Sequence, residues 1–341
     1  MPHRYPIRDI ARQAGVSDAT VDRVLHGRPG VREVTAGLVH QAVRDLDAQR
    51  VQLELTGRRF MVDVVVDAPA RFTSAVRRGL EHSLPALRPA VFRARFHFRE
   101  RWDPRDCADT LRRIAARGSH GVVLKAPDVA GITAAVDALE AAGVPVVTLV
   151  TDLPGSRRRA YVGFDNRSAG ATAAYLVDQW MRDAPGDVAV VVSNDRFRGE
   201  EEREMGFRAA LRALAPDRAV HDVSGGDGLD RTTYELFRRV LAEHPRLSAV
   251  YSVGGGNAGI LAAFDDAGRA PRVFVGHDLA PENVELLRTG RIHAVLHHDL
   301  EQDVQRCCRV LLQAHGALPP DERRQATKID VITPYNVPAG L

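Results

Sequence analysis

Hydrophobic residues recur with a helical period at the start of the chain. Apolar residues spaced i, i+3, i+4 and i+7, followed by Gly15, predict a first short helix with one buried face: Ile7, Ile10, Ala11 and Ala14. Ser17 is a typical N-cap for a second helix over about 18–26, which the glycines and proline of 27–30 end. A third helix is predicted from a longer apolar stripe: Val34, Leu38, Val39, Ala42, Val43 and Leu46.

After a polar connection over 47–60, short apolar runs alternate with amphipathic stretches. The runs predict strands at 61–67, 92–98, 120–124, 144–150, 160–163, 188–193, 248–252, 272–276 and 291–296, with helices between most of them, among them 129–142, 166–182, 200–214 and 229–243. This alternation is typical of parallel sheets covered by helices. Several strands end in loops of Asp, Asn, Gly and Pro. Because ligands bind at the carboxyl ends of such strands, two sheets facing each other would enclose a binding cleft.

Composition restricts the class of protein. The chain has 341 residues, of which 45% are hydrophobic and 27% charged, as is typical of a globular protein with more than one domain. It has no apolar run of the roughly 18 residues that a transmembrane helix needs, and no signal-peptide pattern, so we expect a cytoplasmic protein without a membrane partner. Cys107, Cys307 and Cys308 lack metal-ligand spacing. We therefore expect reduced thiols, no metal and no cofactor.

Positive charge is concentrated at the start of the chain. Residues 1–60 hold ten arginines and seven acidic residues, so they carry the whole net charge of +3. A small positive domain beside a neutral body fits a domain that contacts DNA phosphates.

Residues 7–27, IRDIARQAGVSDATVDRVLHG, resemble the DNA-binding headpiece of the lactose repressor (LacI) family. The resemblance rests on the Ile-Ala-x-x-Ala-Gly-Val-Ser corner, the Thr-Val-x-Arg-Val-Leu helix and the Gly-Val-Arg before the third helix. Such a corner lets two helices cross steeply, so that the second can enter the major groove. A small three-helix domain used for protein contacts is the alternative.

The resemblance implies DNA contacts by a set of headpiece residues: Ile7, Ser17, Asp18, Ala19, Thr20, Asp22, Arg23, His26 and Arg32. Arg23 is the expected guanine reader, because its guanidinium can pair with O6 and N7 together. Binding of a phosphate is the alternative role for this arginine.

The connection after the third helix departs from the family. Family members usually carry a Tyr-Arg-Pro-Asn run and then an Ala-Arg-x-Leu hinge helix, which wedges a leucine between base pairs. Here the connection is DAQRVQLELTG over 47–57, about three residues shorter. Leu53 or Leu55 could be the wedge, or could cover the top of the sensor domain. The sequence leaves open whether a minor-groove hinge helix forms.

The resemblance continues into a sensor domain similar to periplasmic sugar-binding proteins. The motifs that carry it follow in order: GVPVVT at 143–148, DLPGSR at 152–157, YVGFDN at 161–166, EREMGF at 202–207, GGGNAG at 254–259, VGHD at 275–278 and HHD at 297–299. They imply an all-α helix-turn-helix headpiece followed by an α/β sensor, a two-lobed type I periplasmic-binding-protein-like fold with two parallel sheets. We place the headpiece at 1–50, the linker or hinge at 51–60 and the ligand-binding and dimerisation domain at 61–341. Lobe 1 would cover about 61–163 and 296–326, and lobe 2 about 164–295 and 327–341.

The same resemblance implies six ligand contacts: Phe72, Asp152, Arg203, Asn257, Asp278 and His298. Phe72 would stack on a sugar ring, Asp152 would accept hydrogen bonds and Arg203 would donate them. His298 stands where a glutamine is commoner. Acceptors alternating with forked donors suit a polyhydroxylated molecule.

Each of these contacts has an ordinary alternative. Arg203 could pair with Glu200 or Glu204 on a helix surface, and Asp152 could cap a turn. Lys125, one of only two lysines, ends a predicted strand and is expected to lie at the cleft mouth without a catalytic role.

These observations predict a ligand-responsive transcription regulator, in the simplest case a repressor. It would bind a pseudo-palindromic operator in double-stranded DNA as a homodimer, and a small polar effector: a sugar, a polyol or a sugar acid. The prolines and glycine of the 334–341 tail cannot continue a helix, so we expect no tetramer. A cytosolic solute-binding protein and an α/β enzyme without a DNA-binding role are the alternatives. Since the chain lacks a G-x-S-x-G elbow and a P-loop, we expect no enzyme activity.

Overall fold

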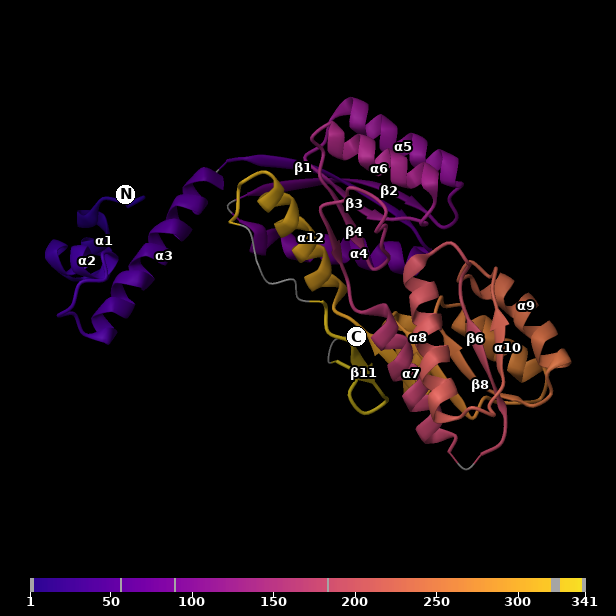
Figure 1. Ribbon diagram of the computed structural model, residues 1–341. Helices are drawn as coiled ribbons and strands as arrows, with labels where there is room; N and C mark the ends of the chain where they lie inside the picture. Colours follow the sequence, from indigo (N-terminus) through magenta and orange to yellow (C-terminus); the bar gives the residue numbers. More distant parts are fainter. Residues whose placement is uncertain (1–2, 56, 89, 183, 320–325, 339–341) are drawn as a thin grey trace.

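The computed structural model describes residues 3–55, 57–88, 90–182, 184–319 and 326–338, and they form three successive parts (Figure 1). A helical headpiece lies at the N-terminal end, its long last helix leads away from it, and two α/β lobes follow. Within the described residues, no helix is both long and apolar enough to cross a membrane. The three cysteines are buried and free, as expected.

The headpiece consists of three helices: α1 (Ile7–Ala14), α2 (Asp18–Leu25) and α3 (Glu33–Leu55). Gly15, with a φ of 67°, ends α1 in the left-handed conformation that glycine adopts without a steric penalty. Ser17 caps α2 by accepting a hydrogen bond from the Thr20 N–H. A small core holds the helices together: Ile10, Ala11, Val21, Val39 and Ala42.

The sequence prediction for the third helix is wrong in two respects. The helix continues to Leu55, so residues 51–55 of the predicted linker are helical. Residues 47–55 are mostly good helix formers, and the first glycine comes only at Gly57. Two members of the predicted stripe, Val34 and Leu38, are 79% and 49% exposed, because α3 reaches the headpiece core through the turn around Val39 instead. Leu53 is 76% exposed and does not cover the sensor, while the side chain of Leu55 lies outside the described ones.

Lobe 1 contains a five-stranded, fully parallel sheet in the order β2-β1-β3-β4-β5. Its strands are β1 (Arg59–Asp67), β2 (Val91–Arg99), β3 (Val122–Lys125), β4 (Val146–Leu149) and β5 (Ala160–Val162). Helices α5 (Pro104–Arg117) and α6 (Ala130–Ala141) pack together on one face. On the other face lie α4 (Ala70–Ser83), the 3-10 turn η1 (Leu84–Leu87) and α12 (Leu300–Ala314).

Lobe 2 contains a six-stranded sheet in the order β11-β10-β9-β8-β6-β7, parallel except for β11. Its strands are β6 (Asp187–Val191), β7 (Val220–Val223), β8 (Leu247–Ser252), β9 (Val273–His277), β10 (Ala294–His297) and β11 (Asp330–Ile332). Its helices are α7 (Asn166–Trp180), α8 (Arg198–Leu214), α9 (Asp230–Glu243), α10 (Asn257–Asp266) and α11 (Pro281–Arg288). Every predicted strand is confirmed, whereas β7 and β11 were not predicted.

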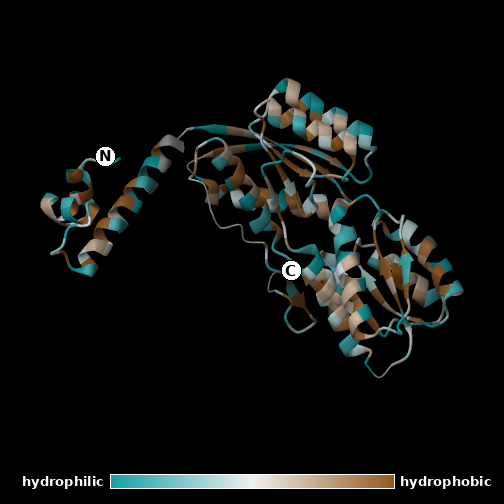
Figure 2. Cartoon of the chain, viewed as in Figure 1, coloured by the Kyte–Doolittle hydropathy of each residue, from teal (hydrophilic) through white to brown (hydrophobic). Residues whose placement is uncertain are grey.

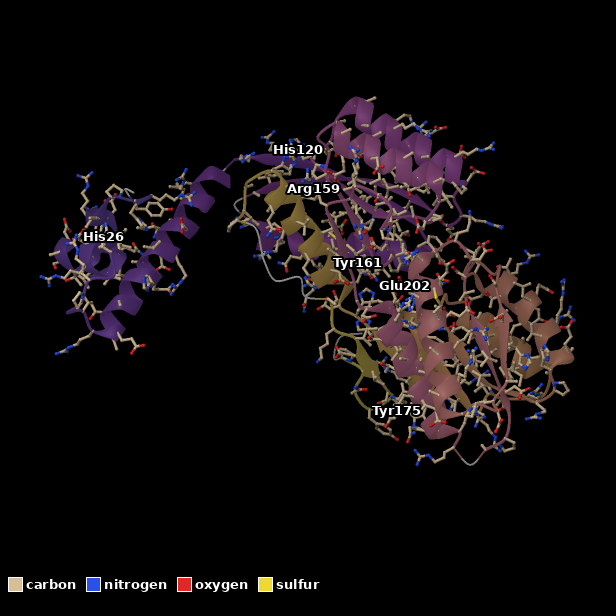
Figure 3. All side chains as sticks on the ribbon, in the orientation of Figure 1. His26, His120, Arg159, Tyr161, Tyr175 and Glu202 are labelled. Carbon is tan, nitrogen blue, oxygen red and sulfur yellow. The ribbon has the colours of Figure 1, made fainter. Side chains whose placement is uncertain are left out.

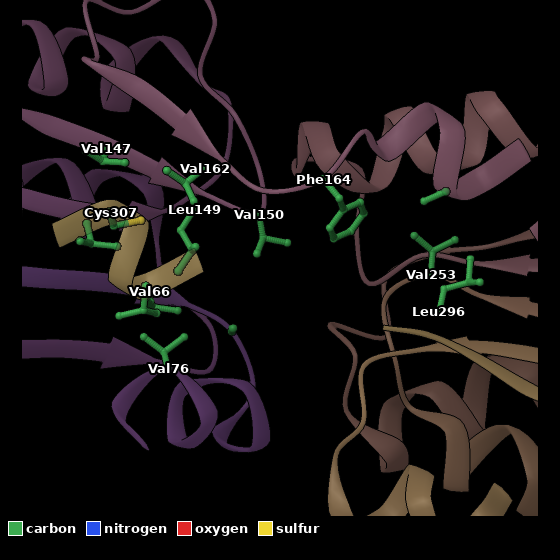
Figure 4. Packing of buried hydrophobic residues seen from close by; sticks show 14 of the residues in the cluster. Val66, Val76, Val147, Leu149, Val150, Val162, Phe164, Val253, Leu296 and Cys307 are labelled. Atoms are coloured by element: carbon green, nitrogen blue, oxygen red, sulfur yellow. The ribbon is translucent and has the colours of Figure 1, made fainter. Parts of the chain in front are cut away.

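In both lobes the strands are mostly hydrophobic, and the outer faces of the helices that cover them are mostly polar (Figure 2). Strands buried on both faces read as near-continuous runs of Val, Ile and Leu, and β4 is buried along its whole length. One hydrophobic cluster extends across the junction of the lobes, where Val150 and Phe164 lie between the two sheets (Figure 4). The lobes therefore share part of their core at the crossover.

The crossover is fixed by hydrogen bonds around Tyr161, which lies where the two lobes meet (Figure 3). Its hydroxyl is 3.2 Å from the carbonyl oxygen of Val150 and 3.0 Å from that of Phe164, and it accepts a hydrogen bond from the side-chain amide of Asn166. Burial raises the pKa of Tyr161, so its proton is retained at neutral pH.

Candidate functional site

The second headpiece helix exposes one polar face, far from the lobes (Figure 3). Asp18, Ala19, Arg23 and His26 are exposed on it, at spacings that place them on one side of a helix. Arg32 is exposed just before α3. The structure thus brings the exposed predicted contacts of α2 onto one surface, and it leaves Arg32 exposed next to α3.

Two charged residues of α2 differ in whether they form ion pairs within the headpiece. Asp22 accepts hydrogen bonds from Arg28 at 2.9 Å and lies 3.0 Å from the ring of His26. Arg23 has no ion pair within the described part of the chain. An arginine on an exposed helix face without an internal partner is available for a base edge or a phosphate.

The remaining predicted DNA contacts take part in capping or packing the headpiece helices. The hydroxyl groups of Ser17 and Thr20 lie 2.9 Å apart at the start of α2. Ile7 is partly buried and packs against the headpiece core. Ser17 and Thr20 thus stabilise the start of α2, and Ile7 stabilises the packing of α1.

A cleft lies between the lobes, at the carboxyl ends of strands from both sheets. Its cavity of about 130 Å³ has room for several water molecules and so for a small polar ligand. Five of the six predicted ligand contacts line it: Phe72, Arg203, Asn257, Asp278 and His298.

Four buried polar atoms of the cleft have no hydrogen-bond partner within the described residues. They are Asp67 Oδ2, Arg203 Nε, Asn257 Oδ1 and His277 Nδ1. Buried polar groups in folded proteins are nearly always satisfied, so a group of unpaired atoms around one cavity points to a missing partner. The two side-chain oxygens can accept hydrogen bonds, the arginine nitrogen donates one, and the imidazole nitrogen can do either. A hydroxyl group both donates and accepts, so these atoms suit a hydroxylated ligand.

Hydrogen bonds within lobe 2 fix the polar side chains that this lobe contributes to the cleft. The side-chain amide of Asn257 donates to Asn283 at 2.7 Å, and the amide of Asn283 donates to the carbonyl oxygens of His277 and Asp278 at 2.9 and 2.8 Å. The other nitrogen of His277 lies 2.8 Å from the hydroxyl of Tyr251. Burial lowers the pKa of His277 well below its usual value, so this imidazole is neutral.

His298 connects the cleft with a buried carboxylate. Its Nδ1 lies 2.7 Å from Asp303, and its Nε2 lies 3.6 Å from Asp278. His298 and Asp303 are both buried, whereas half of the Asp278 side chain is accessible. Asp303 therefore orients the ring, and Nε2 and Asp278 together face the cavity.

Lobe 1 contributes an aromatic ring, a lysine and a carboxyl group. The Lys125 amine donates to the carbonyl oxygen of Asp67 at 3.0 Å, and lies 5.5 Å from the ring centre of Phe72 and 4.0 Å from that of Phe197. Burial lowers the pKa of Lys125, with Glu200 and Asp67 acting against the shift. Burial raises the pKa of Asp67 to about 6, although Lys125 and Arg196 oppose it.

The prediction that Asp152 contacts the ligand is not supported by its position, since it does not line the cavity. Its carboxylate accepts hydrogen bonds from Arg158, from Thr148 and from the Leu153 N–H. Burial alone would raise the pKa of Asp152, but these bonds outweigh it and the pKa is lowered. Asp152 shapes the loop after β4, the alternative that the sequence left open.

Two arginines of lobe 1 reach lobe 2. Arg71 donates to the carbonyl oxygens of Gly228 and Gly254 at 2.8 and 3.3 Å, and Arg101 forms an ion pair of 2.8 Å with Asp227. A Cβ at Gly255 would lie 1.9 Å from the Arg71 guanidinium, so the close approach requires glycine there. These contacts hold the lobes together across the cleft.

Strained backbone conformations also occur around the cleft. In the described part of the chain, the non-glycine residues with positive φ are Val150 at 65°, Asp227 at 50° and Asp278 at 65°, and all three line the cleft. This conformation is costly for a β-branched residue such as valine. Strained residues tend to cluster at binding sites, which supports the assignment of the cleft.

Sequence reasoning missed several residues of the cleft, among them Asp67, Arg71, Glu200 and His277. Asp67 ends β1 directly, and its place at a strand end was a usable signal. Nothing in the sequence indicated Arg71 or Glu200, whose roles depend on contacts with distant segments.

Comparison with known proteins agrees with this architecture. Residues 64–316 match the periplasmic binding protein domain family, and residues 6–48 match the bacterial regulatory proteins of the lacI family. GanP, a glucose-galactose binding protein from Geobacillus stearothermophilus, has a similar structure with a TM-score of 0.73 and 20% identity, covering 82% of this chain and 99% of GanP. At that identity the likeness shows the fold alone.

Two curated relatives are transcriptional regulators. The HTH-type transcriptional regulator AglR of Rhizobium meliloti is 30% identical over 184 residues, which is 51% of this chain and 49% of AglR. The HTH-type transcriptional regulator GntR of Pseudomonas aeruginosa is 28% identical over 255 residues, which is 73% of this chain and 71% of GntR. The match thus spans about half the length of the first relative. The chain therefore belongs to the periplasmic binding protein domain family, and its helix-turn-helix headpiece matches the bacterial regulatory proteins of the lacI family.

Proposed function

We propose that this chain is a ligand-responsive repressor that acts in the cytoplasm and binds a pseudo-palindromic operator as a homodimer. Its effector is a small sugar-like molecule held in the interlobe cleft by Phe72, Arg203, Asn257, Asp278 and His298. The DNA contacts come from the exposed face of α2, with Arg23 as a base reader. Catalysis has no part in this function.

One observation carries the proposal most of all. Among the described residues, four buried polar atoms of the interlobe cavity have no partner, and Arg23 on α2 is exposed without an ion pair. The first feature fits a receptor for a hydroxylated molecule, and the second fits a reader of the major groove. A single chain with both features couples ligand binding to DNA binding.

The coupling has a physical requirement. An effector changes operator affinity only if it binds one lobe arrangement better than another. Arg71 and Arg101 cross between the lobes at the cleft, so a ligand that satisfies the atoms around them favours one closure angle. In a dimer, a change of that angle moves one headpiece relative to the other.

The test starts from DNA, because the operator sequence is unknown. The full-length protein is used to select binding sites from random duplexes, and binding of the enriched duplex is followed by fluorescence anisotropy at several salt concentrations. We expect two inverted half-sites and an affinity that falls steeply with salt. Enrichment of no sequence, or of a single unrepeated half-site, would contradict the dimeric operator.

The second arm identifies the effector class. Thermal unfolding of the full-length protein is followed with neutral sugars, polyols and sugar acids in turn. A ligand present at a hundred times its Kd adds about 2.7 kcal/mol of stability. A compound that stabilises the protein should also change the anisotropy of the selected duplex. If stabilising compounds leave DNA binding unchanged, the chain binds ligands without acting as an effector-controlled repressor.

A further inference from the structure

Two cations line the same cavity from different lobes, and neither forms an ion pair with a carboxylate in the described part of the chain. Lys125 comes from the end of β3 in lobe 1, and Arg203 comes from α8 in lobe 2. Within the described residues, neither side chain forms an ion pair, and Arg203, only 6% exposed, has an unpaired Nε. Instead, Lys125 lies over the ring of Phe197 and Arg203 over the ring of Phe164.

The neighbouring carboxylates are already engaged or poorly suited to pair with these cations. Both oxygens of Glu200 accept hydrogen bonds of 2.7 Å from Ser193, one from its N–H and one from its hydroxyl. Asp227 is paired with Arg101. Asp67 forms no ion pair with either cation within the described residues, and Asp278 faces the cavity beside His298, 3.6 Å away. The carboxylates of the cleft thus leave Lys125 and Arg203 without an ion-pair partner in the described part of the chain.

Lys125 has unused hydrogen-bonding capacity. An ammonium group has three N–H donors, and the described contacts use one of them, to the carbonyl oxygen of Asp67. A charge taken out of water without a partner is costly, and an anion placed next to it recovers much of that cost. The amine and the Arg203 guanidinium come from different lobes, so one anion between them would be bound by both.

We propose that the effector is a polyhydroxy carboxylic acid, such as an aldonate or a uronate, whose carboxylate lies between Lys125 and Arg203. This inference rests on the proposed function and selects one class among its sugar-like effectors. The hydroxyl groups of such a molecule supply donors for the unpaired oxygens Asp67 Oδ2 and Asn257 Oδ1. Its carboxylate binds cations of both lobes, so that an acid favours lobe closure more than the corresponding neutral sugar does.

The test compares ligands that differ only in charge. Binding of D-galacturonate, its methyl ester and D-galactose to the full-length protein is measured by calorimetry, together with D-gluconate against D-glucitol. A hydrogen bond to a charged group corresponds to roughly tenfold to a hundredfold in affinity, so we expect at least one acid to exceed its neutral counterpart by that factor. The ester comparison needs no variant, which keeps the test independent of protein folding.

A pair of variants then assigns the preference to one side chain. Lys125→Met should lower the ratio of acid to neutral affinity about tenfold or more and leave only the part that Arg203 contributes. Lys328→Met changes the only other lysine, whose side chain is 87% exposed and pairs with Asp330, and should leave the ratio unchanged. If the ratio in Lys125→Met equals that of the wild type, the carboxylate lies elsewhere and the proposal fails.

The remaining outcomes separate this inference from the function on which it rests. If the neutral members bind as tightly as the acids, the anionic effector is refuted while a sugar-like effector stands. Tighter binding of D-glucose 6-phosphate than of every acid would assign the cations to a phosphate and overturn the carboxylate. If no compound of either kind binds, the sugar-like effector of the proposed function fails as well.

Discussion

Replacement of Asp67 by asparagine should stabilise the protein at neutral pH. Asp67 is only 3% exposed, its Oδ2 has no partner within the described residues, and burial raises its pKa from 3.8 to about 6. A carboxyl group with a raised pKa in the folded state binds its proton more tightly there than in the unfolded chain. Its stabilising contribution is therefore complete below pH 3.8 and is lost as the pH rises through about 6.

The size of the effect follows from the shift. About two pKa units correspond to roughly 3 kcal/mol between the acid and neutral ends of this range. Asparagine has nearly the same shape and no charge to bury, so Asp67→Asn should escape this loss. Its advantage over the wild type should grow between pH 4 and pH 6 and stay near 3 kcal/mol above pH 7.

Asp63 supplies a matched control on the same strand. It is buried like Asp67, but Arg95, His97 and Arg117 lie within 2.7–2.8 Å of its carboxylate. Burial alone would raise the pKa of Asp63, but hydrogen bonds from His97 and Arg95 lower it to about 2. Its stabilising contribution is present above pH 3.8 and is lost only as the pH falls through about 2. Asp63→Asn should therefore destabilise the protein by about 2–3 kcal/mol at every pH from 4.5 to 7.5.

The assay is urea unfolding of both variants and the wild type at pH 4.5, 5.5, 6.5 and 7.5. The reasoning requires a stabilisation by Asp67→Asn that grows with pH and a destabilisation by Asp63→Asn that does not. An Asp67→Asn protein equal to or less stable than the wild type at pH 7.5 would show that the buried carboxylate is compensated in the folded state.

Three further predictions concern function. Arg23→Ala should relax the preference for one base pair in each half-site by about 1–3 kcal/mol in competition assays, whereas an equal loss on all sequences would make Arg23 a phosphate contact. Arg203→Ala and Asp278→Ala should each weaken effector binding tenfold to a hundredfold in calorimetry, while Asp152→Asn should not, because Asp152 lies outside the cavity. Light scattering at micromolar concentration should give the mass of two chains, and the mass of four would contradict the expected dimer.

The fold could be predicted from the sequence wherever the pattern is decided locally. The valine-rich strands of both sheets are buried on both faces, and their runs are visible in the sequence. β7 was missed because its residues, Val220–Val223, include a histidine and an aspartate at the sheet edge. The extension of α3 was not predicted because a polar stretch is also typical of a loop, although these residues favour helix.

The sequence predicted where the candidate site lies, but not which of its charged side chains pair with each other. Asp278 and Asn257 follow strand ends, and both line the cleft. Asp152 also follows a strand end, yet Arg158, six residues later, takes its carboxylate. Lys125 and Asp67 are candidate site residues because their side chains lack partners within the described residues. Which charged groups come near them is decided by the packing of both lobes.

The unbroken α3 has a mechanical consequence. Its 23 residues span about 34 Å at 1.5 Å per residue, close to one turn of DNA. A stiff rod of that length amplifies motion: a tilt of about 10° at its sensor end displaces the far end by about 6 Å, or half the width of the major groove. In the proposed dimer, small rotations of lobe 1 would then be enough to change the spacing of the two recognition helices and bring one of them out of phase with its half-site.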